Sequence, residues 1–395
     1  MTTLDVALCF ESVLPSKGGA ETYLGDLSRR LAADGHRVHL YACRWDSAAL
    51  PTEMVFHRLP SPLGPRFLRP WRFAAAVNRA LAATDHDVTV GFDKTYGQDV
   101  LYPQGGLHAA SRWHNRLKFG SPLARLAGDF GKLFDPAARS FARLERRQYL
   151  GPDSPVIVVN SQMVAGHFER FLGVPASRLR VIHSAIDPRR FAAPDRARVR
   201  AAERAAWGVP DGVPVGLFVG MNYRLKGLAP LVEAVARVHE DRKFRIAVVG
   251  HTNDAAYRAL AHRRDVADRV LFLGHRRDPK AAYFAADFLV HPTFYDPCSL
   301  VALEALACGL PVVTTRYNGA SELLGDPPAG AVVRDPHDAA GLAAAVGDLL
   351  NPAHRARLAE RATVAAAAWT FEDHYRALVA VFAEVRDRKR AGVPA

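Results

Sequence analysis

HPTFYDPCSLVALEALACG, residues 291–309, joins a short apolar strand to an apolar helix through a single acidic residue. The expected strand, Phe288 to His291, is followed by Asp296, and the expected helix, Ser299 to Ala307, carries one carboxylate, Glu304. A helix that is apolar on all sides is typically buried, and a lone Glu on it is costly unless a partner meets its charge. The segment therefore predicts a buried strand–helix unit in which two carboxylates need an explanation.

The two acids are spaced for an extended ligand. Asp296 and Glu304 are eight residues apart, about 12 Å along a helix axis. That span suits a nucleotide sugar, with the hexose at Asp296, the ribose at Glu304 and the diphosphate at the helix N-terminus (Ser299, Leu300), where free N–H groups favour anions. Alternatively, Asp296 only caps the helix, with Pro297 in its first turn. Capping would leave Glu304 unexplained.

Acid-x7-acid before an apolar helix, followed by ACGLPVVTT (307–315), resembles the nucleotide-sugar signature of retaining glycosyltransferases of family 4. GGAETYLGDLSRRLAADGHRVHLYACRWD (18–46) and VGFDKTYGQDVLYPQGG (90–106) resemble most the bacterial lipopolysaccharide-core glucosyltransferases. The resemblance covers nearly the whole chain and implies the GT-B architecture, two doubly wound Rossmann-like domains facing a cleft. It departs at one position, because the family's first acid is normally Glu and Asp296 is one methylene shorter.

The pattern along the chain supports an α/β fold with two domains. A chain of 395 residues exceeds one typical core, and strand-like runs alternate with amphipathic helices such as Ala20 to Ala33, as in parallel sheets. The expected strands are Leu4–Phe10, Val38–Cys43, Val88–Phe92, Val156–Asn160 and Val181–Ile186, then Val215–Gly220, Arg245–Gly250, Val270–Gly274, Phe288–His291 and Pro311–Thr315.

This series of strands and helices predicts the residue ranges of two domains. We expect an acceptor-side Rossmann-like domain over 1–186 and a nucleotide-sugar-binding domain over 187–370, with the segment Asp187 to Ala205, rich in Pro, Arg and Ala, as linker. The resemblance implies that a C-terminal helix, about Phe371 to Arg388, crosses back so that 371–395 completes the first domain.

Composition indicates a cytoplasmic globular protein. No run reaches the roughly 18 apolar residues of a membrane span, and residues 1–10 lack the basic start and cleavage site of a signal peptide. Four cysteines show no C-x-x-C or His-spaced metal pattern, which favours reduced, buried thiols: Cys9, Cys43, Cys298 and Cys308.

Positive charge is concentrated in one segment. The chain has a net charge of +12, and residues 112–147 contain nine basic and three acidic residues among bulky apolar ones. This mixture is typical of an element that lies on an anionic membrane surface. The alternative is a solvated helical face packed on its domain; no recognition motif for nucleic acid accompanies the charge.

Two cations follow a strand of the second domain. Arg224 and Lys226 lie in MNYRLKG, directly after the strand ending at Gly220. Cations at the carboxyl edge of a sheet can neutralise a leaving diphosphate. No D-x-D motif lies at a plausible strand end except Asp85-His86-Asp87, which precedes an apolar strand, so we expect no metal site and no cofactor. The two cations would then supply the charge that a divalent ion supplies elsewhere.

Loop glycines and a histidine are further candidates. Gly18 and Gly19 follow the first strand, where backbone N–H groups can approach a phosphate, although a plain loop-to-helix turn also explains them. The resemblance places this loop at the donor diphosphate and His108 near the donor sugar; a structural role for His108 is the alternative. It also implies that the loop Gly274 to Arg277, which includes Arg276, holds the nucleotide base through backbone groups.

Two residues are assigned to the acceptor side. Asp99 precedes the loop that carries His108, and Ser161 follows the strand Val156–Asn160 at a position that lines the cleft in the family. Both are interpreted as facing the acceptor.

Together these features predict a metal-independent retaining hexosyltransferase. It would move a hexose, most simply glucose, from UDP to a cell-envelope glycolipid such as the lipopolysaccharide core, at the inner face of the cytoplasmic membrane. The alternatives are a same-fold transferase with another glycan, lipid-linked or small cyclitol acceptor, a two-domain nucleotide-sugar epimerase, and a basic protein that binds anionic lipid or nucleic acid.

Overall fold

The computed structural model describes residues 3–14, 19–92, 94–121, 123, 126, 135–152, 154–276 and 278–392. The chain forms two compact units. Unit 1 comprises Met1–Arg116, Ser121–His183 and Asp373–Ala395, and unit 2 comprises Leu117–Gly120 and Ser184–Glu372. The ranges expected from the sequence divide at 186 and 370.

Unit 1 is built on a parallel sheet of seven strands in the order β5-β3-β1-β6-β7-β8-β9. Its strands are β1 Asp5–Cys9, β3 Arg37–Ala42, β5 Val55–Arg58, β6 Val88–Phe92, β7 Val100–Tyr102, β8 Val156–Val159 and β9 Leu179–Val181. Its helices are α1 Gly19–Ala33, α2 Arg69–Leu81, α3 His108–Leu117, α5 Pro136–Leu150, α6 Gln162–Leu172 and α15 Phe371–Arg390, with 3-10 turns η2 Ser47–Ala49 and η3 Ala176–Arg178. Two short strands, β2 Ser12–Val13 and β4 Arg44–Trp45, pair beside them.

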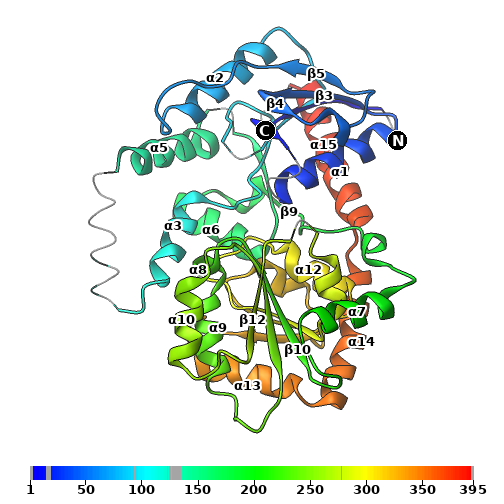
Figure 1. Ribbon diagram of the computed structural model, residues 1–395. Coiled ribbons are helices and arrows are strands. Elements are labelled where there is room, and N and C mark those ends of the chain that lie inside the picture. Colours follow the sequence, from blue (N-terminus) through cyan, green and yellow to red (C-terminus); the bar gives the residue numbers. More distant parts are fainter. Residues whose placement is uncertain are drawn as a thin grey trace. The chain divides into compact units, whose positions relative to one another are not determined.

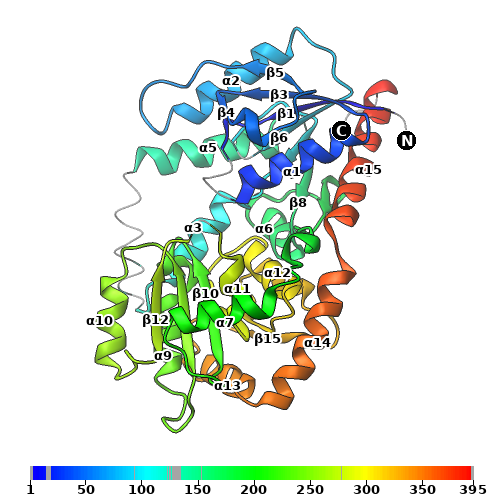
Figure 2. The ribbon, with the colours of Figure 1, turned by 45° about the vertical axis from the view of Figure 1, so that its right-hand side comes forward.

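The C-terminal helix α15 is tied into unit 1 by side chains. His374 Nε2 lies 2.6 Å from the hydroxyl of Tyr23 in α1, and its Nδ1 lies 2.7 Å from the carbonyl of His183. Arg180 pairs with Glu384 at 2.6 Å. Figure 2 shows α15 running beside α1. These contacts bring the end of the chain onto the domain with which it begins.

Unit 2 is built on a parallel sheet of six strands in the order β12-β11-β10-β13-β14-β15. Its strands are β10 Val215–Gly220, β11 Arg245–Gly250, β12 Val270–Gly274, β13 Phe288–His291, β14 Val312–Thr315 and β15 Gly330–Val333. Its helices are α7 Arg196–Ala206, α8 Tyr223–Lys226, α9 Leu228–Val235, α10 Ala255–Arg263, α11 Lys280–Ala285, α12 Leu300–Ala307, α13 Ala339–Leu349 and α14 Pro352–Ala368, with 3-10 turns η4 Pro188–Phe191 and η5 Gly319–Leu323.

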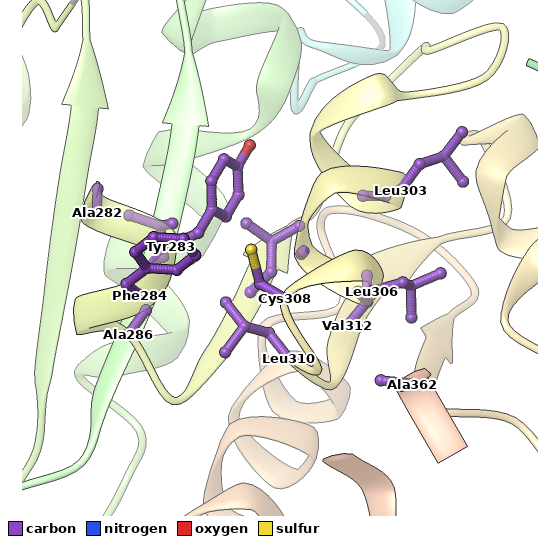
Figure 3. Packing of buried hydrophobic residues seen from close by; sticks show 14 of the residues in the cluster. Ala282, Tyr283, Phe284, Ala286, Leu303, Leu306, Cys308, Leu310, Val312 and Ala362 are labelled. Atoms are coloured by element: carbon purple, nitrogen blue, oxygen red, sulfur yellow. The ribbon is translucent and has the colours of Figure 1, made fainter. Parts of the chain in front are cut away.

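Both faces of the unit 2 sheet are covered, as its apolar strands predict. Val215, Leu217 and Leu289 point into a core shared with α11, α12 and α14, and alternate residues such as Phe218 and Phe288 point into a core shared with α9, α10 and α13. Figure 1 shows α9 and α10 on one side of this sheet and α7, α12 and α14 on the other. In Figure 3, Tyr283 and its neighbours in α11 pack opposite Leu303, Leu306 and Cys308.

Each sheet reverses its strand order once. In unit 1 the chain runs outward from β1 through β3 to β5 and returns to place β6 on the other side of β1. In unit 2 it runs from β10 through β11 to β12 and returns to place β13 beside β10. Ligands of doubly wound sheets bind at the carboxyl ends of the strands at such a switch point. Ligand sites are therefore expected at the loops after β1 and β6 and at those after β10 and β13.

Three details of the sequence prediction are corrected. The expected linker, 187–205, folds as η4 and most of α7, because Arg200 and Arg204 bind the Asp287 carboxylate at 2.6 and 3.2 Å and the segment's apolar residues join the core. The expected strand Val181–Ile186 is β9, which ends at Val181. The short strands β5, β7 and β15 were not predicted.

Two further expectations from the composition concern the cysteines and membrane-spanning helices. All four cysteines are free and buried, as predicted. Within the described ranges, no helix combines the length and the apolar character that crossing a bilayer requires.

Candidate functional site: the carboxyl edge of unit 2

The loops after β10 and β13 are bonded to each other. The carbonyl of Leu225 accepts hydrogen bonds from the backbone N–H of Phe294 at 2.9 Å and from the hydroxyl of Thr293 at 3.1 Å. Gly227 ends α8 with φ of +81°, and a Cβ on it would lie 2.0 Å from the carbonyl oxygen of Pro292. Only glycine therefore allows this close approach, which places Lys226 against the loop that carries Asp296.

Lys226 and Asp296 form a partly buried ion pair at this switch point. Lys226 Nζ lies 2.5 Å from Asp296 Oδ2, and Nε2 of the fully buried His291 lies 3.4 Å from the same oxygen. Burial by itself raises the pKa of the Asp296 carboxyl, but the Lys226 ammonium and the His291 ring hold that pKa well below its usual range. Asp296 is therefore ionised in the folded protein.

The capping alternative for Asp296 is wrong. The N-cap residue of α12 is Ser299, and the side chain of Asp296 is engaged with Lys226 instead. The backbone of Asp296 is fixed separately, because its N–H donates to the carbonyl of Tyr317 and its own carbonyl accepts from Gly319, both at 2.9 Å. Asp296 is thus held rigidly, with its carboxylate presented to a cation.

Asn318 organises the start of α12. Its Oδ1 accepts hydrogen bonds from the N–H groups of Ser299 at 3.2 Å and Ala320 at 3.1 Å, and its Nδ2 donates to Thr314. The N–H of Ser299 therefore already has an acceptor, and the assignment of Ser299 to the diphosphate remains a prediction. Leu300 is the first helical residue of α12 and belongs to the turn whose N–H groups lack intrahelical acceptors. The residues of this turn after Ser299 are therefore the candidates for binding an anion.

Glu304 has a partner that the sequence did not reveal. The hydroxyl of Tyr283 donates a hydrogen bond of 2.6 Å to Glu304 Oε2, and the residue as a whole is partly exposed. Burial raises the pKa of the Glu304 carboxyl to about 7, against the opposing effects of the Tyr283 hydroxyl and the Arg190 charge. The carboxyl is thus destabilised as an anion and would gain from further donors, such as the hydroxyls of a ribose.

Arg224 and Arg276 differ in how firmly they are held. Arg224 is exposed in α8, and its guanidinium lies 4.5 Å from the ring centroid of Phe119. Arg276 pairs with Glu203 at 3.0 Å and follows Gly274, which ends β12 with φ of +68°. The Arg276 side chain therefore fixes its loop to α7, whereas the Arg224 side chain is exposed to solvent.

His108 begins α3 in unit 1 and is held by a carboxylate. The N–H groups of His108 and Ala109 donate to the two oxygens of Glu145, at 2.5 and 3.1 Å. Burial, with the charges of Arg112 and Lys94, lowers the pKa of the imidazole. Its buried Nε2 has no hydrogen-bond partner among the described residues. A neutral ring with one free nitrogen can still bind a sugar hydroxyl or a phosphate.

Gly19 begins α1 at the unit 1 switch point, and Gly18 lies outside the described residues. A hollow beside it is lined by Phe10 after β1, Phe92 at the end of β6 and Gln104 after β7, together with Ala20 and Leu24 of α1. This hollow lies at the carboxyl edge of the sheet, where ligands bind in such folds.

The acceptor-side assignment of Asp99 is corrected. Asp99 directly precedes β7, and its Oδ2 accepts hydrogen bonds from the N–H and hydroxyl of Thr89, both at 2.8 Å. Lys389 lies 3.9 Å from the same oxygen. These contacts place Asp99 at the amino edge of the sheet, opposite the ligand edge, and give it a structural role.

Ser161 is the N-cap of α6. Its hydroxyl oxygen accepts a hydrogen bond of 3.2 Å from the N–H of Val164, and the residue is fully buried. Capping accounts for a serine at this position. Its assignment to the acceptor side remains a prediction.

The basic segment 112–147 is partly outside the described residues, which include α3 and α5. In α5, Leu144 and Tyr149 are buried in unit 1, whereas Arg139, Arg143 and Arg146 are exposed. The apolar side of α5 is therefore not free to enter a membrane, which corrects that part of the prediction. The exposed large hydrophobic residues nearby are Leu123 and Leu126, at 80% and 66% exposure.

Sequence reasoning missed the supporting residues His291, Asn318, Tyr283 and Glu145. Each binds a predicted site residue through a contact that crosses elements of the fold. His291 is inside the quoted segment and ends its strand, so its position was a usable signal. The others carry no local pattern.

Two parallel Rossmann-like sheets, with an ion pair and an apolar helix at the carboxyl edge of the second, define a GT-B type transferase. Matches to known proteins agree: residues 17–190 match "Glycosyltransferase Family 4" and residues 213–352 match "Glycosyl transferases group 1". The chain belongs to glycosyltransferase family 4, as its sequence predicted, and is a glycosyltransferase.

Three proteins illustrate the range of relatives. Lipopolysaccharide glucosyltransferase WaaG of Escherichia coli (strain K12) is 26% identical over 336 residues, 84% of this chain and 85% of that protein. The crystal structure of WaaG, described as a glycosyltransferase involved in lipopolysaccharide biosynthesis, gives a TM-score of 0.75 at 24% identity and covers 96% of this chain and 99% of that chain. This structural match confirms the GT-B fold.

The names of the other two proteins mention an inositol phosphate and UDP-glucose. D-inositol 3-phosphate glycosyltransferase of Xylanimonas cellulosilytica is 30% identical over 396 residues, 95% of this chain and 93% of that protein. HepE of Anabaena, in complex with UDP-glucose, gives a TM-score of 0.67 at 18% identity and covers 96% of this chain and 100% of that chain.

Proposed function

We propose that this glycosyltransferase moves glucose, with retention of configuration, from UDP-glucose to a cell-envelope glycolipid such as the lipopolysaccharide core. The observation that carries the proposal is the Lys226–Asp296 pair at the β10/β13 switch point, next to the start of α12 and in the same helix–loop unit as Glu304. The names of WaaG and of the HepE complex support glucose and UDP as the starting hypothesis.

The donor would bind along the edge of unit 2. Glu304 accepts hydrogen bonds from the ribose, the first turn of α12 faces the diphosphate, and Asp296 accepts hydrogen bonds from the hexose hydroxyls. The Lys226 ammonium has three donors. It can therefore keep its bond to Asp296 and still donate to phosphate oxygens, while Arg224 reaches the same anion from solvent. Backbone groups of the Gly274 loop hold the base.

The reaction would proceed on one face of the sugar. The bond from the anomeric carbon to the phosphate oxygen breaks, and the acceptor hydroxyl forms a bond to the same face of that carbon. Its proton passes to the departing phosphate oxygen. Asp296 is not the nucleophile in this scheme, because Lys226 holds its carboxylate. Arg224, Lys226 and the α12 N-terminus stabilise the negative charge that develops on the diphosphate.

This arrangement needs no metal ion for the chemical step. Lys226 and Arg224 provide the positive charge that a divalent ion would otherwise place on the diphosphate. His108, with its neutral ring and free Nε2, is proposed to donate to or accept from the sugar or the leaving phosphate.

We further propose peripheral binding at the inner face of the cytoplasmic membrane. The exposed arginines of α5 would bind anionic headgroups, and Leu123 and Leu126 would provide shallow insertion. This binding would bring the donor site to a lipid-linked acceptor.

A second candidate is transfer to a small cyclitol phosphate. The 30% identity over 95% of the chain to a D-inositol 3-phosphate glycosyltransferase favours it. Such an acceptor is freely diffusible, so this enzyme would need no membrane.

One experiment separates these functions. The purified chain is incubated with UDP-glucose and either a lipopolysaccharide-core fragment, inositol 3-phosphate or no acceptor, and UDP release and the anomeric configuration of the product are measured by NMR. Core-dependent release with retained configuration supports the first proposal, and inositol-phosphate-dependent release supports the second. Equal release without any acceptor would point to an epimerase or a hydrolase, and inversion would refute the mechanism.

A further inference from the structure

A group of imidazoles and a carboxylate lies at the amino edge of the unit 1 sheet, away from its ligand edge. Asp5 is the first residue of β1, and His39 on the neighbouring strand β3 pairs in register with Ala7. The connection from α2 to β6 passes this edge and brings in His86. Strands β3 and β5 lie beside α2 in Figure 1.

The donor atoms of these three residues converge. Asp5 Oδ1 lies 2.5 Å from His86 Nδ1 and 3.5 Å from His39 Nε2. One ligand atom from each of Asp5, His39 and His86 can be chosen so that all lie within 4.8 Å of one another. Around a tetrahedral ion with bonds of about 2.0–2.1 Å, ligand atoms are about 3.3 Å apart. The Asp5–His39 separation is already close to this spacing, whereas the shorter Asp5–His86 contact would have to open to admit an ion.

The outer nitrogens of both rings already have partners. His39 Nδ1 lies 2.9 Å from Nε2 of His57, and His86 Nε2 lies 2.9 Å from the hydroxyl of Tyr41. Imidazoles that bind a metal through one nitrogen characteristically hydrogen-bond through the other, which fixes ring orientation and tautomer. This outer arrangement turns His39 Nε2 and His86 Nδ1 toward Asp5.

One of the inward nitrogens is buried without a partner. His39 is 6% exposed, and its Nε2 makes no hydrogen bond within the described residues, although it faces the Asp5 carboxylate. If Nδ1 donates its proton to His57, Nε2 presents a lone pair toward a negatively charged oxygen. A buried polar atom in this state is costly, and a cation between the two groups would satisfy both.

We propose that Asp5, His39 and His86 form a structural site for a divalent transition metal of the Zn²⁺ class. Two imidazole nitrogens and one carboxylate oxygen suit Zn²⁺, whereas Mg²⁺ and Ca²⁺ prefer oxygen ligands. The side chain of Asp5 is 25% exposed, which leaves a path for the ion and a position for water as the fourth ligand. Arg37 lies 3.7 Å from the other Asp5 oxygen and leaves Oδ1 to the ion.

Such a site would hold three separate parts of unit 1 together. It would join β1, β3 and the α2–β6 connection, whose position is also fixed by a 2.7 Å hydrogen bond from Lys389 of α15 to the His86 carbonyl. Gly19 and His108 lie at the opposite, carboxyl edge of the same sheet. The ion would therefore stabilise the fold and take no part in the transfer step, so the inference is independent of the proposed reaction.

The test uses the untagged full chain, stripped of metal with a chelator and then titrated calorimetrically with Zn²⁺ or Mg²⁺. We expect one Zn²⁺ per chain, a raised melting temperature with Zn²⁺ and no effect of Mg²⁺, because only the folded state binds the ion. Co²⁺ in the same site should give the visible absorption of a tetrahedral centre. Absence of stoichiometric Zn²⁺ binding, or of the Co²⁺ bands, would overturn the proposal.

Substitutions locate the ion. His39→Gln, His86→Gln and Asp5→Asn should each weaken Zn²⁺ binding by at least about tenfold, the lower end of the effect seen even for outer partners. His239→Gln changes an exposed histidine of unit 2 and should bind Zn²⁺ as the parent does. Circular dichroism checks that each variant is folded. If the three folded variants bind Zn²⁺ as tightly as the parent, the ion is elsewhere and the assignment is wrong.

Discussion

Replacing Glu304 by Gln should stabilise the protein and weaken nucleotide binding at the same time. The Glu304 carboxyl has a pKa raised by burial from 4.5 to about 7. The folded protein thus holds a proton that the unfolded chain has released between these pH values. Its contribution to the free energy of unfolding is complete below pH 4.5 and is lost as the pH rises through 7.

The size of the change in stability follows from the shift in the Glu304 pKa. Each pKa unit corresponds to about 1.4 kcal/mol, so the ionised carboxylate lowers stability by about 3 kcal/mol at pH 8, an upper bound because Glu304 is partly exposed. Gln keeps an oxygen for the Tyr283 hydroxyl and carries no charge. Glu304→Gln should therefore match the parent in stability at pH 4.5 and exceed it at pH 8.

Affinity for the nucleotide should move in the opposite direction. A ribose hydroxyl that donates to a carboxylate contributes roughly 1.5–3 kcal/mol, so Glu304→Gln should weaken UDP binding about tenfold or more at pH 8. In the parent, UDP binding should tighten from pH 5.5 to 8.5 as the carboxyl ionises; in the variant this dependence on Glu304 should disappear.

Urea unfolding followed by tryptophan fluorescence and calorimetric UDP titrations, both at several pH values, measure these effects. Glu360→Gln, at an exposed position of α14, is the matched control and should change neither quantity. If Glu304→Gln unfolds at the same urea concentration as the parent at pH 8 and binds UDP equally well, both the buried anion and its role at the ribose are refuted.

Four further outcomes are expected. Asp296→Asn should lower kcat much more than UDP affinity, because its carboxylate is proposed to contact the hexose; equal losses in both would indicate a purely structural role. Arg224→Ala and Lys226→Ala should each lower kcat about a hundredfold by removing charge from the leaving diphosphate, and an unchanged kcat in the double variant would exclude them from the mechanism. Turnover measured well below the melting temperature should survive EDTA; loss of turnover that Mg²⁺ or Mn²⁺ restores would contradict a metal-free chemical step. Replacing Arg139, Arg143 and Arg146 by Glu should abolish sedimentation with anionic vesicles and leave turnover on a soluble acceptor intact, whereas equal sedimentation of the parent with neutral and anionic vesicles would argue against an electrostatic membrane surface.

The strands of unit 2 show which elements a pattern of apolar residues can predict and which it cannot. β10 to β13 have the bounds predicted from runs of apolar residues, because strands buried on both faces carry a strong and uninterrupted signal. The four-residue strand β15 and the three-residue strand β7 are too short for such a signal. The segment around α7 looked like a linker because it is rich in arginine. Two of its arginines, Arg200 and Arg204, are bound to Asp287, a contact that only the fold creates.

The residues of the candidate site also fall into two groups, those that the sequence indicates and those that only the fold brings together. Asp296, Glu304 and Lys226 could be singled out because each is a charged residue at a strand end or in an apolar helix. Their partners are far away in sequence: 70 residues separate Lys226 from Asp296, and 21 separate Tyr283 from Glu304. Asp99 was misassigned because sequence order alone placed it near the His108 loop, whereas the direction of the strand puts it at the opposite edge of the sheet.

The return of α15 to unit 1 affects how the chain can fold during synthesis. Unit 2 is almost continuous, from Ser184 to Glu372, and can fold once that stretch has left the ribosome. Unit 1 lacks the helix that binds Tyr23, His183 and Arg180 until α15 has been made. Multidomain chains usually fold their N-terminal domain first. Here unit 1 is completed only after unit 2 has been synthesised, so translation that stops within α15 would leave a folded unit 2 attached to an unfinished unit 1.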